Sequence, residues 1–309
     1  MDACVSNGCD YVDITGEVPF ISAMARKYHE TCEKKGIKVI HCCGYDSVPS
    51  DIGTLAIVRR AREMGKTIRK VTTIVGDSRG GVSGGTIASG MNLMADPALR
   101  ASDMSMYAYI PQGETKGSDK DVWSPQYSKA TQGWLAPFVM AAVNTRVVQR
   151  SNYLLNYGKE HFSYAEHLGA KSWWQAWTVA IITGVIGLAI GQTWMHPLVK
   201  KIVPKQGEGP STETMMTGYY THQLVGECTD GELIMGTFTD KHRDPGYWGT
   251  SRLLLEAALC LAMDKKALDN CPDVLKGGVL TPASGLGTVY QHRLADAGIE
   301  CSVARNFEK

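Results

Sequence analysis

Several features that would point to common functions are missing from this sequence. Neither sign of charge is in excess, because 32 lysines and arginines are balanced by 31 aspartates and glutamates. No overall field attracts nucleic acid, so we expect no nucleic-acid partner. None of the nine cysteines forms a C-x-x-C pair and no cysteine/histidine cluster has zinc-ligand spacing, which predicts no metal site. Nucleophile-elbow, Walker and paired-carboxylate signatures are absent as well.

A secretory signal is also missing. Met1 is followed by Asp2, Ala3 and Cys4 rather than by a basic region and an apolar run. The adjacent pair Cys42-Cys43 has poor geometry for an ordinary disulfide, and reduced, mostly buried thiols are the simplest interpretation of the cysteines. These observations predict an intracellular protein.

The first part of the chain has the element order of an α/β fold. The predicted elements are a strand at 11–14, a helix at 19–35, a strand at 37–41 and a helix at 52–64. Short connections between them predict a parallel layer that is too small to be a whole domain. We interpret 1–65 as a partial, doubly wound Rossmann-like remnant. We interpret 66–309 as an α+β substrate or dimerisation domain whose C-terminal segment packs back on the remnant.

The second part of the chain predicts further strands and helices. Expected strands are 71–75, 216–227, 232–239 and 299–303, and expected helices are 86–94, 250–263 and 282–297. The residues 76–85 form a glycine-rich loop whose spacing fits neither G-x-G-x-x-G nor G-x-x-x-x-G-K-[ST]. A tight turn near a pocket therefore explains this loop better than a phosphate site does. The polar residues 111–121 predict a surface loop.

The segment 172–199 contains no formally charged residue and is largely apolar between Trp177 and Ile190. Its apolar centre includes Ile182, Ile186 and Leu188. Tryptophans lie at both ends of the segment, Trp177 near the first end and Trp194 near the second, as is typical of a helix that meets a membrane interface. Lysines lie outside the tryptophans on both sides. Small residues at Gly184, Gly187 and Gly191 would permit close helix packing. We predict a membrane-associated helix; the alternative is a buried core helix of a soluble domain.

Six segments, in order along the chain, resemble the motifs of one family. Residues 11–17 match Y-x-D-x-T-G-E, 43–51 match C-G-[FY]-D-S-x-P-S-D and 83–89 match S-G-G-T-x-x-S, and 207–211, 244–247 and 278–283 follow in the same order. The chain therefore resembles the saccharopine dehydrogenase-like oxidoreductases, which are related to the trans-acting enoyl reductases of lipid biosynthesis. The resemblance covers essentially the whole sequence.

The resemblance implies an NADP- or NAD-linked oxidoreductase acting on a lipid or lipid-linked small molecule in lipid or glycolipid metabolism. Together with the apolar segment 172–199, it predicts a protein at a membrane or lipid-droplet surface, with the endoplasmic reticulum and the mitochondrion as alternatives, and allows a homo-oligomer. Family members begin with a strand and a G-A-[TS]-G-[FY]-[TV]-G loop that has no counterpart here. We expect weak dinucleotide binding by an N-terminally truncated chain. A non-catalytic lipid-surface protein and an incomplete gene model are the alternatives.

Candidate site residues follow two predicted strands. Thr15, Gly16 and Glu17 lie at the carboxyl end of the first strand, where doubly wound sheets bind ligands, and are predicted to contact the cofactor. Glu17 would orient a substrate or the nicotinamide ribose, or else cap the following helix. Tyr45 and Asp46 are the catalytic candidates, and the tyrosine would serve as a proton donor only if its hydroxyl faced the nicotinamide pocket. Substrate-pocket candidates are Ser83, Gly84, Gly85 and Thr86. Ser47 and Asp51 are expected to cap the next helix and complement its dipole, and His222 and His242 have no predicted partner.

Overall fold

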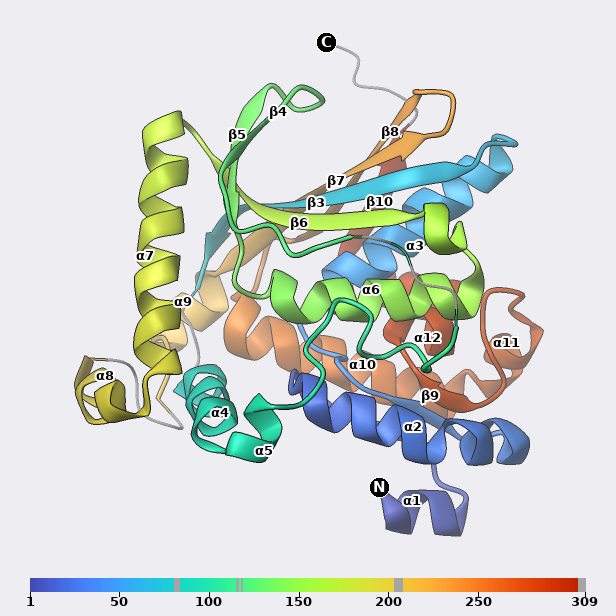
Figure 1. Cartoon of the computed structure of the whole chain (residues 1–309). Coiled ribbons are helices and arrows are strands. Elements are labelled where there is room, and N and C mark those ends of the chain that lie inside the picture. Colours follow the sequence, from blue (N-terminus) through green and yellow to red (C-terminus); the bar gives the residue numbers. More distant parts are fainter. Residues whose placement is uncertain (81–83, 115–116, 118, 203–207, 305–309) are drawn as a thin grey trace.

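The computed structural model describes residues 1–80, 84–114, 117, 119–202 and 208–304 as two β-sheets with helices around them (Figure 1). The strands are β1 (Tyr11–Val12), β2 (Lys38–Ile40), β3 (Ile68–Arg79), β4 (Gln126–Ser128), β5 (Gly133–Pro137), β6 (Ser163–Ala170), β7 (Tyr219–Cys228), β8 (Leu233–Asp240), β9 (Gly278–Leu280) and β10 (Glu300–Ala304). The helices are α1 (Asp2–Asn7), α2 (Val18–Lys35), α3 (Val48–Glu63), α4 (Gly84–Ala95), α5 (Pro97–Arg100), α6 (Ala141–Leu155), α7 (Trp173–Gly191), α8 (His196–Ile202), α9 (Thr212–Thr217), α10 (Thr250–Met263), α11 (Lys265–Asn270) and α12 (Pro282–Asp296). Short helical turns are η1 (Lys159–His161), η2 (Thr193–Met195) and the π-helical η3 (Pro245–Gly249).

The smaller sheet is parallel and has the order β1-β2-β9. Its third strand comes from the other end of the chain, since Val39 of β2 pairs with Val279 of β9. Side chains cover the outer edge of β9: the guanidinium of Arg150 donates to the carbonyl oxygen of Val279, and the Val279 amide donates to His29 Nδ1 at 3.1 Å. The C-terminal segment thus completes the N-terminal layer.

The larger sheet has the order β10-β8-β7-β3-β6-β5-β4. Only the β3–β6 pair is parallel, and the other neighbours run antiparallel. β3 lies at its centre and runs to Arg79, so the expectation of a loop beginning at Gly76 is wrong. The strand continues because Ser78 and Arg79 pair with Tyr220 and Tyr219 of β7 beyond a register shift. Long-range pairing overrides the weak strand propensity of these residues.

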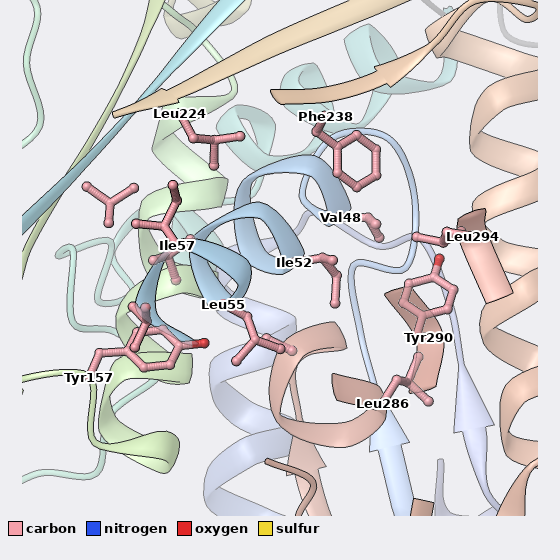
Figure 2. Packing of buried hydrophobic residues seen from close by; sticks show 14 of the residues in the cluster. Val48, Ile52, Leu55, Ile57, Tyr157, Leu224, Phe238, Leu286, Tyr290 and Leu294 are labelled. Carbon is pink, nitrogen blue, oxygen red and sulfur yellow. The ribbon is translucent and has the colours of Figure 1, made fainter. Parts of the chain in front are cut away.

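The main core lies around α3, which packs between the two sheets (Figure 2). Ile52, Leu55 and Ile57 are fully buried on this helix. They meet side chains from both sheets and from α12, among them Leu224 of β7 and Leu286. Ser50, Asp51 and Thr54 are buried on the same helix, so its burial is not visible as a continuous apolar run in the sequence. Burial of each large apolar side chain contributes about 1.5–3 kcal/mol.

Helix α7 is the exception to this burial, because it lies along the side of the molecule (Figure 1). Ala176 is its one buried residue, whereas Leu188 is 69% exposed. The helix contacts β5, β6 and α4, yet a Cβ added at Gly184, Gly187 or Gly191 would meet no atom of another described element within 4 Å. No described element of this chain packs on these glycines, so their close packing against another helix stays a prediction.

Candidate active site

The loops that follow β1 and β2 meet at the carboxyl edge of the parallel sheet. The Cys43 amide donates to the Asp13 carbonyl oxygen at 2.8 Å, and the Cys42 thiol donates to the Thr15 carbonyl oxygen at 3.0 Å. Cys42 has a φ of 61°, a left-handed conformation that a side chain other than glycine rarely adopts. Strain of this kind gathers at ligand-binding sites.

Glu17 is bound by side chains from two elements. The Thr15 hydroxyl donates to one carboxylate oxygen, and Ser89 Oγ of α4 donates to the other at 2.6 Å. Glu17 stands at the N-cap of α2, but its side chain caps no backbone amide of that helix. Gly16 lies beside α6, where an added Cβ would be 3.8 Å from Val143. The carboxylate is therefore held for another purpose than capping.

Tyr45 is paired with a histidine from the larger sheet. Its hydroxyl lies 3.1 Å from Nε2 of His222 on β7, and its ring packs edge-on against Tyr220 and His222. Burial lowers the pKa of His222 to about 3, so the imidazole is neutral at physiological pH. Burial also raises the pKa of Tyr45, so its hydroxyl keeps its proton. The sequence offered no sign of the partner, since 177 residues separate the pair.

Two carboxyl groups lie near Tyr45. Burial raises the pKa of Asp46 to about 6. Glu166 of β6 is fully buried, and its Oε1 accepts hydrogen bonds from Ser50 Oγ at 2.9 Å and Asn144 Nδ2 at 3.2 Å. Burial raises the pKa of Glu166 to about 8. Sequence reasoning missed Glu166, because a single acidic residue within a strand carries no recognisable pattern.

The rest of the motif at 43–51 has a structural role. Ser47 is the N-cap residue of α3, but its hydroxyl donates to Asn144 Oδ1 at 2.9 Å and caps no amide, so that part of the expectation is wrong. Asp51 does lie in the first turn, and its carboxylate accepts from the Ala283 amide at 2.8 Å. It therefore joins α3 to the start of α12.

The described substrate-pocket candidates lie on the helix that contacts Glu17. Ser83 falls outside the described residues, while Gly84, Gly85 and Thr86 begin α4, the helix that carries Ser89.

The motif at 244–247 also has a structural explanation, because the carboxylate of Asp244 accepts hydrogen bonds from three backbone amides of η3. A cavity of about 370 Å³ lies beside Val58 and Arg62. It is at the opposite end of α3 from Tyr45 and does not belong to this site.

This edge does not fit the phosphates of a dinucleotide in the part of the chain that the structure describes. Phosphate binding needs free amides at a helix N-terminus, without a competing negative charge. Each helix that follows a strand of the parallel sheet begins beside an acidic side chain, Glu17 at α2, Asp46 at α3 and Asp51 at α12. The Thr281 hydroxyl also accepts an amide of α12. The edge offers hydrogen-bond acceptors and therefore suits hydroxyl groups better than phosphate.

Comparison with known proteins identifies relatives along nearly the whole chain. A Mycobacterium tuberculosis protein provisionally named as a trans-acting enoyl reductase is 34% identical over 327 residues, which cover 98% of this chain and 76% of the relative. The trans-acting enoyl reductase of Mycobacterium leprae is 32% identical over 331 residues with the same coverage. Apo saccharopine dehydrogenase from Saccharomyces cerevisiae aligns with 98% of this chain and 81% of its own at 12% identity, with a TM-score of 0.44. No protein-family model matches the chain.

The identity and coverage of these relatives confirm the resemblance that the ordered motifs predict. The chain belongs to the family of oxidoreductases named trans-acting enoyl reductases.

Proposed function

We propose that this oxidoreductase reduces an unsaturated, lipid-linked acyl group at a membrane surface, with Tyr45 as the proton donor. The observation that carries the proposal is the hydrogen bond between Tyr45 and a neutral histidine at the carboxyl edge of the parallel sheet. Tyr45 and Asp46 keep partial exposure, while the residues on either side of them are buried. The proposal requires a substrate to reach the Tyr45 hydroxyl, which lies against the buried His222.

The tautomer of His222 decides the direction of the phenolic proton. When His222 carries its proton on Nε2, the imidazole donates to the Tyr45 oxygen, and the phenolic hydrogen remains free to face a substrate. Reduction of a carbon–carbon double bond consumes one proton at carbon, and a positioned acid contributes roughly 10²–10⁴-fold to such a step. The family implies NADP or NAD as the source of the hydride. Because the described edge does not fit the phosphates of the dinucleotide, we assign no residue to them.

Helix α7 supplies the proposed membrane contact. It is the one described helix long and apolar enough to cross a membrane. Ile182 and Ile186 are 52% and 53% exposed, and Trp174 and Trp194 at the two ends are 74% and 75% exposed. Aromatic rings at both ends suit the two borders of a lipid layer, and Lys171 and Lys200 outside them suit anionic headgroups. These features favour a lipid surface over a second protein as the partner.

The catalytic part is tested with a long-chain 2-enoyl thioester in vesicles and either NADPH or NADH. Tyr45→Phe should lower kcat by about 10²–10⁴-fold, whereas Tyr127→Phe on the exposed strand β4 should leave it unchanged. A Tyr45→Phe enzyme as active as the wild type would refute the role of Tyr45. No reduction by the wild-type chain with either cofactor would favour the alternative of a non-catalytic lipid-surface protein.

The membrane part is tested by flotation with vesicles that contain anionic lipid. Replacing Ile182 and Ile186 with lysine should release the protein, because each lysine at the bilayer centre costs about 2.5–3.5 kcal/mol. The matched control places lysine at Val139, in the turn before α6, and at Leu255 of α10, which are 58% and 55% exposed. Sedimentation of the wild-type chain without lipid as a dimer through α7 would identify a second copy as the partner instead.

A further inference from the structure

Glu166 is a buried carboxyl group to which the proposed reaction gives no role. It lies on β6 and is 3% exposed. Neutral groups donate to its oxygens: the Ser50 hydroxyl at 2.9 Å, the Asn144 amide at 3.2 Å and the Tyr164 hydroxyl at 3.5 Å. These donors do not cancel the cost of burial, which raises the pKa of Glu166 to about 8. The carboxyl group therefore holds a proton at neutral pH and can release it close to that pH.

A small pocket leads from Glu166 toward the outer surface. It lies between the start of α6 and β6 and has a volume of about 10 Å³, which is room for about one water molecule. Glu166 is one of its lining residues, and the exposed Lys120 and Trp123 line it as well. Asp121, which also lines the pocket, pairs with Arg146. A proton can thus reach Glu166 from solvent without opening of the core.

Glu166 and the Tyr45 pair lie on one face of the larger sheet. Glu166 pairs with Thr73 of β3, and His222 of β7 pairs with the residue two positions farther along β3. Residues two apart on a strand share a face, so Glu166 and His222 lie on the same face with β3 between them. Burial raises the pKa of Tyr45, and the charges of Asp46 and Glu166 raise it further. The carboxyl groups and the phenol therefore form one electrostatic cluster.

Ordered water can bridge the space between Glu166 and Tyr45. Neighbouring strands are about 4.8 Å apart, so roughly 10 Å separates β6 from β7 across β3. Among the described residues, His222 Nδ1 and the Tyr220 hydroxyl are buried beside Tyr45 without a hydrogen-bond partner. Buried polar atoms of this kind are commonly hydrogen-bonded to ordered water. A short chain of such waters, in hydrogen bonds of about 2.8 Å, can carry a proton over this distance.

We propose that Glu166 returns a proton to Tyr45 after each reduction, through water that links the two side chains. The inference deepens the proposed function and rests on it for the role of Tyr45. Donation of the phenolic proton to the substrate carbon leaves Tyr45 as a phenolate. Glu166 then gives its proton to the water chain, the phenolate takes one from the other end, and the Glu166 carboxylate regains a proton from solvent through the pocket. The transfer is favourable because the pKa of Tyr45, raised by burial, lies above that of Glu166.

The first test observes the proton of Glu166 by infrared spectroscopy of the full-length chain. The wild type at pH 7 should show a carboxyl C=O band that Glu166→Gln removes and that fades above about pH 8. In heavy water the band should shift rapidly to its deuterated position. Ala142→Leu, which fills the pocket, should slow this shift by about 10-fold, equivalent to about 1.4 kcal/mol on the barrier. Glu160→Gln on the exposed turn η1 is the matched control and should change neither result.

The difference between wild type and Glu166→Gln isolates this band from the other groups that titrate near it. These groups occur in both proteins and are Tyr45, Asp46, Asp51, Tyr164 and His222. A difference spectrum without a carboxyl band at pH 7 overturns the inference. Equal exchange rates in the wild type and in Ala142→Leu overturn it as well.

The second test separates the first turnover from the later ones, with a long-chain 2-enoyl thioester in vesicles and NADPH or NADH. Glu166→Gln should complete the first reduction at the wild-type rate, because Tyr45 starts with its proton. Its later turnovers should be slower by about 10²-fold, and the fall of the wild-type kcat above about pH 8 should be missing. A purely structural role of Glu166 predicts an equally slow first turnover, and that result overturns the inference.

The outcomes also distinguish the inference from the proposed function. Wild-type rates in every turnover of Glu166→Gln, beside a loss of activity in Tyr45→Phe, would overturn the inference alone. A wild-type chain that reduces no substrate with either cofactor would refute the proposed function and the inference together.

Discussion

Replacement of Glu166 by glutamine should remove much of the pH dependence of stability around neutrality. Glutamine has the shape of a protonated carboxyl group, and its oxygen can still accept from Ser50 and Asn144. Burial raises the pKa of Glu166 from 4.5 to about 8, so the folded protein holds a proton that the unfolded chain releases at much lower pH. The free energy of unfolding therefore falls as pH rises from about 4.5 to about 8, and this contribution levels off above that.

The magnitude follows from the two pKa values. A difference of about 3.5 units at 1.36 kcal/mol per unit is worth about 5 kcal/mol well above pH 8, and about 3 kcal/mol of this is lost between pH 6 and pH 9. Asp51 is also buried, with a pKa raised to about 7, but it titrates in both proteins. The difference in stability between wild type and variant isolates the contribution of Glu166.

The assay is urea denaturation of wild type and Glu166→Gln at pH 6, 7, 8 and 9. The variant should gain about 3 kcal/mol relative to the wild type across this range. Glu33→Gln on the exposed face of α2 is the matched control and should follow the wild type at every pH. A constant difference between Glu166→Gln and the wild type would show that Glu166 does not titrate there in the folded protein, and the reasoning would fail.

Three other predictions concern stability and are measured by chemical denaturation at pH 7. Arg150→Met should lower the free energy of unfolding by about 3–5 kcal/mol, because it leaves the buried carbonyl oxygens of Val279 and Tyr109 without hydrogen-bond donors. A loss below 1 kcal/mol would show that the edge strand β9 does not depend on the hydrogen bonds of this guanidinium. Asp244→Ala should cost about 2 kcal/mol through the loss of three amide contacts in η3, and Asp244→Asn should restore part of this. Gly287→Ala should cost about 1–3 kcal/mol, because φ is 55° and the new Cβ would lie 2.6 Å from Val274; an unchanged midpoint would contradict this reading.

The sequence predicted the elements that carry strong local signals. The helix expected at 250–263 coincides with α10, and that expected at 282–297 ends one residue later than α12. Asp230-Gly231 correctly predicted the turn between β7 and β8. The strand expected from Met216 begins instead at Tyr219, since Met216 lies in the last turn of α9.

Elements that depend on distant partners were not visible in the sequence. β9 has only three residues and was noticed as a motif rather than as a strand, because its pairing with β2 spans most of the chain. The same limit applies to the site. Tyr45, Glu17 and Ser89 stood out within motifs, whereas His222 and Glu166 did not. The contacts of Tyr45 with His222 and of Glu17 with Ser89 come only from the fold. A spacing rule in sequence cannot connect residues that long-range pairing brings together.

The pairing of β2 with β9 has a consequence for the order of folding. The parallel sheet joins residues near position 39 to residues near position 279, so its closure requires a very long loop of chain. During synthesis on the ribosome, the N-terminal strands and helices must wait until nearly the whole protein has emerged. Contacts of such high sequence separation form slowly, and the waiting segment exposes apolar surface in the meantime. We therefore expect the small sheet to form late in refolding, after the hairpin of β7 and β8, and chaperones to bind the nascent chain chiefly through its first 64 residues.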